Sequence, residues 1–488
     1  MADSQDFALF TVGATTTWGY DAAASNPRRS MPARDLRAED AILDPFARDQ
    51  VVSNSRDANR NWTVAAWMIR KHLDFVSDFR FHPKTNDEGF DRDLRAFVDN
   101  WSKKDNFTTS KRYSLRRWMR IAEACRTMDG DGVVEKVRGG LVNYIRGDRI
   151  RNAPPGQAAR DWKHGVRANA FGELVAYCVQ KRGFDGRYKF DKLLPAKNAV
   201  HHAYLTDADQ IRGVSPVTTA LNMLRDCYES VDFAMARMKI ETLFGVYIKQ
   251  QPDISGNPFQ GNQQFVPVEV TDEDTDETLA AKREAQREAE DVSGLVDLGR
   301  GPWSTELRPG EDIGTVQSNN PSANQQMFME ACIQIALKAL DIPYSFWRED
   351  FTNFVGSRGA LQLYRRSASH KQADNQELLD ELTRWRLSLA ILDGDIRPPR
   401  GTTVDDIKFT WHPRGIPWWD RAKEVQGDLQ AIGACLDNPE SVCLERGEED
   451  VFYNIRKRAE VERYAEQHGV VLNFTPMPQQ IEVVTNDG

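Results

Sequence analysis

The sequence predicts an α+β chain in which long helices accompany a small β-rich module. Three observations lead to this prediction. Residues 212 to 249 carry apolar side chains at alternating spacings of four and three, which is typical of one long helix. A second helical pattern runs from residue 357 to residue 392. Ahead of both helices, residues 132 to 206 contain short runs of β-branched and aromatic residues separated by turns, which is typical of strands.

Composition limits the class of protein. The chain has 488 residues, of which 40% are hydrophobic, so it can form two to four domains with sizeable cores. The net charge of −9 is uneven: residues 269–291 hold ten acids and three bases, whereas residues 136–167 hold eight bases and two acids. Overall acidity argues against a protein that grips nucleic-acid phosphates tightly, but it permits a surface past which DNA slides.

We expect a soluble, intracellular protein with no membrane contact. No run of about 18 apolar residues occurs, and the first residues lack the basic start and apolar stretch of a secretory signal. The six cysteines form no C-x-x-C pair, which favours buried free thiols over a zinc site or disulfides.

The first part of the chain predicts an arm followed by helices. Residues 1 to about 45 are polar and irregular, and such arms often bind a neighbouring subunit. We expect helices at about 55–76, 91–102 and 110–128. The last one ends at Asp129-Gly130-Asp131-Gly132, which has the composition of a turn. No further ligand pattern accompanies the two aspartates, so we expect a solvated turn and not a metal site.

Five strands are expected next, at 133–134, 141–145, 165–167, 174–179 and 199–204. The pair His201-His202 does not predict a metal site, because adjacent strand residues point to opposite faces.

The long helix begins with a favourable cap, because Ser215 can bond the first turn and Pro216 suits the first helical position. One face carries an apolar stripe and the other is polar. The pattern fits either an ordinary core helix or a strut between two regions of a large assembly. The stripe consists of Val217, Leu221, Leu224, Tyr228, Val231, Met235 and Met238.

The second half predicts an acidic surface insertion at 250–292, strands at 294–298 and 303–307, and a helix at 322–340 that stops before Pro343. Residues 344–356 mix large aromatics with charges. They predict either a functional loop or a loop that its aromatics anchor to the core. After the 357–392 helix, we expect helices at 417–435 and 448–467, with Gly469 as a stop, and a flexible tail.

The motifs of common enzymes are missing from this sequence. It contains no G-x-x-x-x-G-K-[ST], no G-x-S-x-G and no H-E-x-x-H. We therefore predict no catalytic residues, no cofactor and no metal. A nuclease built from scattered carboxylates is kept as the alternative function.

Two short stretches lie ahead of the long helix, Arg56-Asp57-Ala58-Asn59-Arg60-Asn61 and Gly147-Asp148-Arg149-Ile150. In their order along the chain they resemble the lambda-type family of phage portal proteins, in which the first looks like an early basic helix and the second like the pre-stem β region. The most specific match is residues 196–201 leading to Arg212-Gly213-Val214-Ser215-Pro216, which is similar to the start of the stem helix. Similar stretches follow at 341–344, at 357–360 and from Pro417 to Glu424. The family's Asn-Tyr-Ser-Ser-Ala-Arg run is replaced here by Asn353-Phe354-Val355-Gly356-Ser357-Arg358.

The resemblance implies a portal fold and a ring, typically of twelve subunits, at one capsid vertex. It assigns 1–50 to an N-terminal arm, 51–131 and 293–414 to the wing, 132–211 to the clip, 212–249 to the stem and 415–488 to the crown, with 250–292 as an insertion. The implied partners are double-stranded DNA in the channel, the terminase large subunit, the capsid or scaffolding protein, and a head-completion or adaptor protein. The implied location is the virion, after assembly in the host cytoplasm.

The same resemblance implies three sets of functional residues. The tunnel loop would include Trp347, Arg348, Glu349, Asp350, Phe351, Asn353, Phe354 and Arg358. The polar face of the stem would present Arg225, Asp226, Glu229, Asp232, Arg237 and Lys239. The clip would dock partners through Arg146, Arg149, Arg151, Arg160, Lys163 and Arg167.

Overall fold

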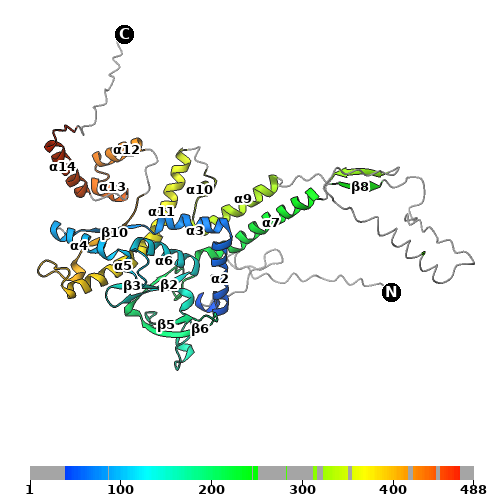
Figure 1. The fold of residues 1–488 in the computed structure, drawn as a ribbon, viewed down its shortest axis with the longest axis horizontal. Coiled ribbons are helices and arrows are strands. Elements are labelled where there is room, and N and C mark those ends of the chain that lie inside the picture. The colour runs from blue at the N-terminus through cyan, green and yellow to red at the C-terminus, as the bar shows by residue number, and fades with distance from the viewer. Residues whose placement is uncertain are drawn as a thin grey trace, which may run out of the picture. The chain divides into compact units, whose positions relative to one another are not determined.

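The computed structural model describes residues 39–85, 87–243, 246–250, 282, 311–315, 323–349, 354–415, 421–446 and 451–472. The chain divides into two compact units (Figure 1). The larger unit consists of residues 1–228 and 328–488, and the smaller of residues 229–327.

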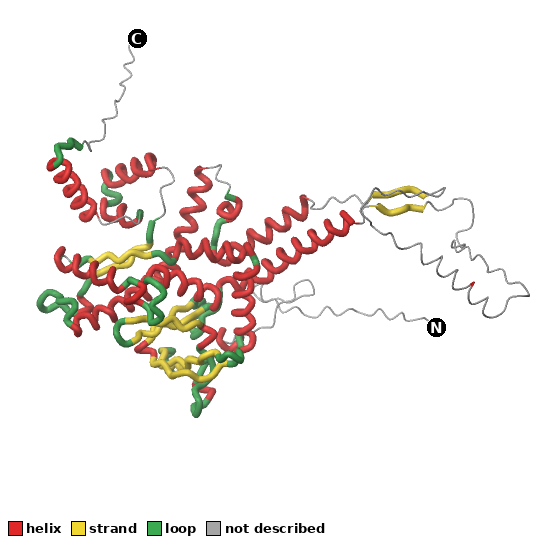
Figure 2. The backbone as a smooth tube through the Cα atoms, viewed as in Figure 1, coloured by secondary structure: helices red, strands yellow, loops and turns green. Residues whose placement is uncertain are grey.

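Helices make up most of the larger unit, as Figure 2 shows. The N-terminal part contains α1 (Glu39–Ile42), α2 (Pro45–Asn61), α3 (Thr63–Val76), α4 (Glu88–Trp101), α5 (Lys104–Phe107) and α6 (Leu115–Asp129). The C-terminal part contains α10 (Tyr344–Arg348), α11 (Phe354–Asp393), α12 (Arg421–Gly433), α13 (Pro439–Glu445) and α14 (Val451–Gln467). Two helices run from one unit into the other, α7 (Leu221–Leu243) and α9 (Ala323–Leu337). Single 3-10 turns occur at 147–149, 159–161, 196–198, 216–220, 338–340 and 404–406.

The strands of the larger unit form small antiparallel sheets. One has the order β3-β2-β7, from Leu141–Arg146, Asp131–Val137 and Ala199–Ala203. A second has the order β4-β5-β6, from Val166–Ala168, Leu174–Arg182 and Tyr188–Pro195. The third pairs β1 (Phe79–Pro83) with β10 (Phe409–Pro413), so that Phe81 lies opposite Trp411.

Two large hydrophobic clusters hold these elements together. The first joins α4, α5, α6, β1 and β10 to the second half of α11, through residues such as Leu94, Trp118 and Leu382. The second joins α3, the start of α7, α9 and the first half of α11, through residues such as Met68, Leu224 and Leu337. Because α11 contributes to both, this 40-residue helix links the two cores.

Within the smaller unit, the structure describes the end of α7, a pair of strands, residue 282 and the start of α9. Strands β8 (Val246–Gln250) and β9 (Glu311–Thr315) are antiparallel, with Val246 opposite Thr315.

Several predicted boundaries were wrong. The predicted helix at 55–76 is two helices, because Trp62 has extended backbone angles (φ −109°, ψ 115°). The helix predicted at 212–249 is confirmed with Ser215 as its cap, but it begins as a 3-10 turn at Pro216, and residues 246–250 form a strand. The aromatic loop predicted at 344–356 includes a helical turn, α10. Strands β1, β6 and β10 and helix α13 were not predicted.

Other predictions are confirmed or lie outside the described residues. The five strands between 133 and 204, the helix ending before Pro343 and the long helix α11 are confirmed. The arm before Glu39, most of the acidic insertion, the strands predicted at 294–298 and 303–307, and the tail after residue 472 lie outside the described residues. None of the helices in the described part of the chain has both the length and the apolar character of a membrane span.

Candidate functional site

A buried carboxylate fixes the segment that leads into α7. Asp131, at the start of β2, is fully buried and accepts hydrogen bonds from Nε and Nη2 of Arg212, at 2.6 and 2.9 Å. Arg48 of α2 donates to the same carboxylate at 2.8 Å and to the carbonyl of Gly213 at 3.0 Å. Three elements far apart in the sequence therefore meet at one carboxylate, just ahead of the long helix.

The charges in this cluster are stable at neutral pH. Burial alone would raise the pKa of Asp131, but the guanidinium groups of Arg212 and Arg48 hold it well below its usual range. Burial and the neighbouring Arg212 lower the pKa of Arg48 to about 10, which still leaves Arg48 protonated. Arg212 also donates to the carbonyls of Gly147, Ile150 and His164, so it fixes the loops around these residues to the same point.

Two glycines allow the close approach that this cluster needs. Gly130 ends α6 with φ +87°, and a Cβ there would lie 2.5 Å from the carbonyl oxygen of Gly213. A Cβ on Gly213 would lie 2.2 Å from the carbonyl oxygen of Gly130. The two backbones are therefore in contact, and only glycine fits at either position.

A second ionic cluster lies on the other side of this turn. Asp129 is 1% exposed and accepts paired hydrogen bonds of 2.8 to 2.9 Å from both Arg56 and Arg146. Arg56 also bonds Asp148 at 2.7 Å. Burial alone would lower the pKa of Arg56, but its hydrogen bonds to the carboxylates of Asp129 and Asp148 raise this pKa overall.

The solvated turn predicted at Asp129 and Asp131 was therefore wrong. Both carboxylates are buried, and arginines neutralise them from α2, β3 and the segment before α7. Sequence reasoning also missed Arg48 and Arg212 as functional residues. The only local signal was the Gly130 between two acids, because the arginine partners lie 17 to 83 residues away in the sequence.

The apolar stripe of α7 is buried only in its first half. Val217, Leu221 and Leu224 are 0 to 8% exposed and belong to the second hydrophobic cluster. Tyr228, Val231, Met235 and Met238 continue the same stripe but are 36 to 52% exposed. The six predicted stem residues, Arg225, Asp226, Glu229, Asp232, Arg237 and Lys239, are all exposed.

The predicted tunnel-loop residues separate into two groups. Trp347 is half-buried and packs edge-on against Trp67 of α3, with ring centroids 5.2 Å apart. Three others are exposed: Arg348 at the end of α10, Glu349 just after it, and Arg358 on α11. Asp350, Phe351 and Asn353 lie outside the described residues, as does the side chain of Phe354.

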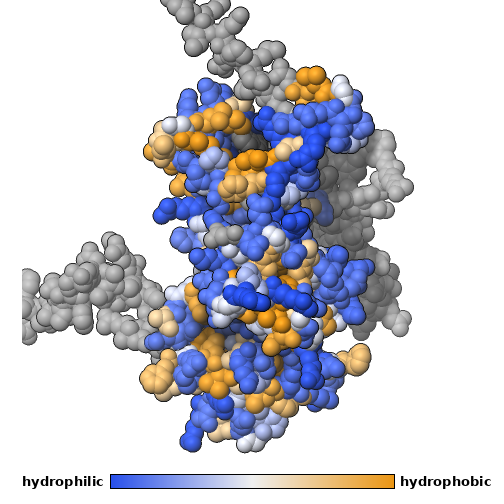
Figure 3. Space-filling view, turned by 90° about the vertical axis from the view of Figure 1, so that its left-hand side faces the viewer, coloured by the Kyte–Doolittle hydropathy of each residue, from blue (hydrophilic) through white to orange (hydrophobic). Residues whose placement is uncertain are grey.

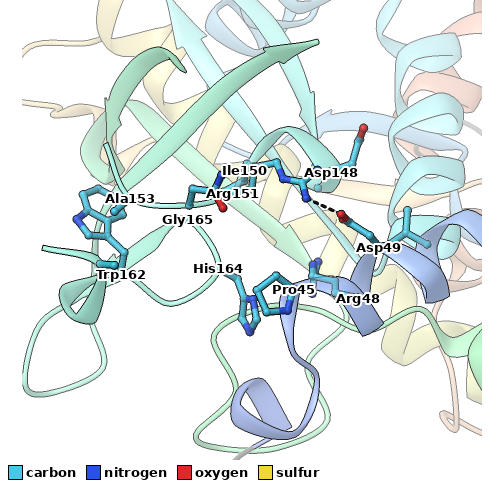
Figure 4. Close-up of a pocket in the computed structure, with 14 residues that line it drawn as sticks. Pro45, Arg48, Asp49, Asp148, Ile150, Arg151, Ala153, Trp162, His164 and Gly165 are labelled. Carbon is cyan, nitrogen blue, oxygen red and sulfur yellow. Dashed lines mark hydrogen bonds and ion pairs between the residues drawn. The ribbon is translucent and has the colours of Figure 1, made fainter. Parts of the chain in front are cut away.

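The predicted clip residues also separate. Arg146 bonds Asp129, Arg149 bonds the carbonyl of Gln180, and Arg151 pairs with Asp49 of α2 at 2.5 Å. Figure 4 shows this last pair at the wall of a cavity of about 140 Å³, which His164 and Trp162 also line. These three arginines bind the region from 132 to 211 to itself, to the end of α6 or to α2.

The other three predicted residues form no ion pair with the described helices α2 or α6 and are exposed or half-buried. Arg160 and Lys163 are exposed, and Arg167 is half-buried with its guanidinium 5.6 Å from the Trp162 ring. Sequence reasoning missed the exposed aromatics of the same sheet, Phe171, Phe184 and Phe190, of which the first two are almost fully exposed at loop tips.

Within the described residues, no group of three or more His, Cys, Asp or Glu side chains is arranged to hold a metal ion. His202 instead bonds Asn375 at 2.8 Å, and His201 lies 3.7 Å from Asp131. All six cysteines are free thiols, and four are buried; Cys435 is exposed and Cys443 is half-buried.

Comparison with known proteins adds the family. The chain is similar in fold to three solved structures. In each case the similarity covers 82% of this chain and 94% of the chain in the solved structure. They are the virion of a native gene transfer agent particle (14% identity, TM-score 0.48), the neck of an empty particle computed with C6 symmetry (14%, 0.50) and the neck of a native particle computed with C12 symmetry (12%, 0.47). No curated protein matches the sequence. The family model described as phage portal protein, lambda family, matches residues 26–372, which is more than two thirds of the chain. The chain belongs to the lambda family of phage portal proteins.

Proposed function

We propose that this portal protein assembles into a closed ring of twelve subunits at one capsid vertex, where double-stranded DNA passes through the channel during packaging and ejection. The exposed half of the α7 stripe is the observation that supports this proposal best. Four apolar residues in helical register face solvent on an isolated chain, although burying such surface is favourable by about 25 cal/mol per Å². Adjacent copies of α7 would cover it in a ring.

The ionic clusters at the start of α7 suit a stem. A helix that connects the two ends of a ring needs a rigid starting point. Asp131 and Asp129 are buried and each accepts several hydrogen bonds, which fixes the backbone ahead of α7. We propose 212–249 as the stem, 132–211 as the clip, 51–131 and 293–414 as the wing, 415–488 as the crown, 1–50 as the arm and 250–292 as an insertion.

The proposed crown has little core of its own. Among the described residues from 421 to 472, only Glu424 and Ala465 are buried, whereas Leu429, Leu436, Phe452, Ile455 and Tyr464 are exposed. Figure 3 shows apolar side chains, in orange, gathered over these helices at the top of the view. Neighbouring copies would cover them, as for the stem.

For the channel, we propose that Arg348, Glu349 and Arg358 contact DNA while Trp347 anchors their loop. Exposed charges of both signs hold DNA weakly, which suits passage, because each additional cation contact strengthens binding. Asp350, Phe351, Asn353 and Phe354 complete the proposed loop.

For the clip, we propose docking of the terminase large subunit and of a head-completion protein. The exposed Phe184 lies in the loop between β5 and β6, close in sequence to Lys181, Arg182, Arg187 and Lys189, which are exposed as well, whereas Phe171 is exposed at the opposite end of β5. This surface suits an acidic partner with an apolar anchor, and it adds residues to Arg160, Lys163 and Arg167. The wing would meet the capsid or scaffolding protein. We propose no catalysis and no cofactor.

Imaging of the purified full-length chain tests the function. We expect closed rings with an axial opening, and no cleavage of plasmid DNA in magnesium or manganese. A chain that stays monomeric at high concentration would count against ring formation. Metal-dependent cleavage of the plasmid would favour the nuclease.

A further inference from the structure

A basic surface on α5 and the start of α6 is not part of any site described above. Between residues 103 and 120 the chain has seven bases and one acid, Asp105. Six of the bases are exposed and Arg120 is half-buried. They are Lys103, Lys104, Lys111, Arg112, Arg116, Arg117 and Arg120. We call this set the α5–α6 basic surface.

The fold brings these residues together on one rigid base. The amide of Leu115 donates to the carbonyl of Ser102 at 2.9 Å, which places the start of α6 against the end of α4. Beneath them, the ring of Phe107 packs edge-on against Trp101 at 5.0 Å and Trp118 at 5.2 Å. The lysines that follow α4 therefore lie next to the arginines that begin α6.

Within the described parts of the chain, two of these cations pair with a carboxylate and the other five do not. Arg116 pairs with Asp78 at 2.6 Å and Arg120 with Asp74 at 2.8 Å, at one side of the surface. The guanidinium groups of Arg112 and Arg117 lie 5.3 and 5.6 Å from the Tyr113 ring. None of the ion pairs formed among the described residues involves Lys103, Lys104, Lys111, Arg112 or Arg117. Their charge is available to an external anion.

A groove beside Lys111 is lined by a further cation. Its volume is about 300 Å³, and Arg386 of α11, Asn100, Asn106 and Asp105 line it with Lys111. The guanidinium of Arg386 lies 4.7 Å from the Phe97 ring. Arg386 therefore adds a positive charge beside the exposed lysines and arginines of this surface.

The composition of the surface identifies the class of ligand. Among the described residues from 47 to 170, no large hydrophobic side chain is exposed. Protein interfaces have an apolar core, which this surface lacks, whereas phosphate backbones are bound through lysine and arginine. We propose that the α5–α6 basic surface binds the phosphate backbone of duplex DNA, independently of sequence.

This inference does not depend on ring formation, and its residues differ from the channel candidates at 344–358. It assigns the chain two kinds of contact with DNA: a weak one at the proposed tunnel loop and a stronger one on α5 and α6.

The test compares two triple variants of the full-length chain. The first is Lys111→Gln, Arg112→Gln and Arg117→Gln. The matched control, Arg70→Gln, Lys338→Gln and Arg366→Gln, removes the same charge from exposed positions of α3, the 338–340 turn and α11. Binding of a fluorescent duplex of about 30 base pairs is measured by anisotropy at several salt concentrations, with poly-glutamate and inorganic phosphate as competitors. Thermal melting confirms that each variant is folded.

We expect the first variant to weaken duplex binding at least about tenfold and to reduce the slope of log K against log salt by about 2 to 3, since each lost phosphate contact contributes about 0.9. The control should bind as the unmodified chain does. An equal loss of duplex affinity in both variants would mean that net charge alone determines binding, which would overturn the proposal. No duplex binding by the unmodified chain at low salt, or a loss confined to poly-glutamate binding, would overturn it as well.

Discussion

Arg212 and Asp131 form a two-bond ion pair from which solvent is excluded, with side chains that are 1% and 0% exposed. The pair joins the first residue of β2 to the segment that precedes α7. Its position means that the orientation of the proposed stem depends on a charge pair buried in the larger unit.

Replacing Arg212 by Gln should therefore destabilise the protein strongly. The change leaves Asp131 buried with Arg48 as its remaining strong partner and removes three donors to backbone carbonyls. Breaking a buried pair costs about 3 to 5 kcal/mol. Urea unfolding measures this loss. Arg160→Gln, at a side chain that is 89% exposed, is the control and should change the free energy of unfolding by less than about 1 kcal/mol. Equal effects would refute the anchoring role.

Gly130→Ala should cost more than Gly139→Ala, although both glycines have φ near +85°. The shared positive φ contributes about 1 to 2 kcal/mol of strain to each variant. Only the Cβ at position 130 meets another backbone, at 2.5 Å from the Gly213 carbonyl, whereas nothing lies within 4 Å of a Cβ at position 139. Melting temperatures compare the two. If Gly139→Ala is as harmful, the contact between Gly130 and Gly213 has no role in stability.

Stability should fall as the pH drops below about 6.5, because two buried histidines resist protonation. Burial lowers the pKa of His72 and of His202 and outweighs the attraction of Glu123. The unfolded chain then binds more protons than the folded chain between the lowered values and 6.5, so stability present above 6.5 is lost as the pH falls.

Glu123 acts in the same direction at lower pH. Burial opposes its ionisation, but Arg126 and the two histidines hold its pKa well below its usual value, so its contribution is lost on further acidification. Melting at about pH 7.5 and about pH 5.5 tests the histidines. His72→Gln with His202→Gln should flatten the pH dependence, whereas exposed His370→Gln should not. An unchanged slope in the double variant would exclude these histidines as the cause.

The two parts of the proposed tunnel loop should respond differently to alanine. Trp347→Ala removes a ring packed on Trp67 and should cost about 3 kcal/mol of stability. Arg348→Ala and Arg358→Ala are at exposed positions, so both should leave the melting temperature and ring formation unchanged and reduce the amount of nuclease-protected DNA in filled heads. Unaltered packaging in both arginine variants would remove them from the channel.

Local periodicity predicted the longer helices and half of the described strands but could not place long-range partners. Strand β1 pairs with β10 more than 300 residues later, and neither short run has a distinctive pattern by itself. The α7 stripe predicted one buried face along its whole length. It could not show that burial within the chain ends near Tyr228, because that depends on where α3 and α9 lie.

The site was harder to predict than the fold. Asp129 and Asp131 have the sequence of a turn, and their burial follows from arginines on other elements. Residues 136–167 are rich in bases, but sequence alone could not tell Arg146, which bonds Asp129, from the exposed Arg160. Whether an arginine binds its own chain or a partner depends on tertiary contacts.

Particle mass under matched stem substitutions tests the central claim most directly. Val231→Asp with Met235→Asp places charges in the exposed half of the α7 stripe, and Leu363→Asp with Leu392→Asp does the same at exposed positions of α11. We expect the unmodified chain and the α11 variant to form rings of about 670 kDa, twelve copies of a 55.5 kDa chain, and the stem variant to remain a monomer. Mass photometry distinguishes these species. A monomeric unmodified chain at high concentration, or a stem variant that forms rings as readily as the α11 variant, would contradict the assembly of this portal protein through α7.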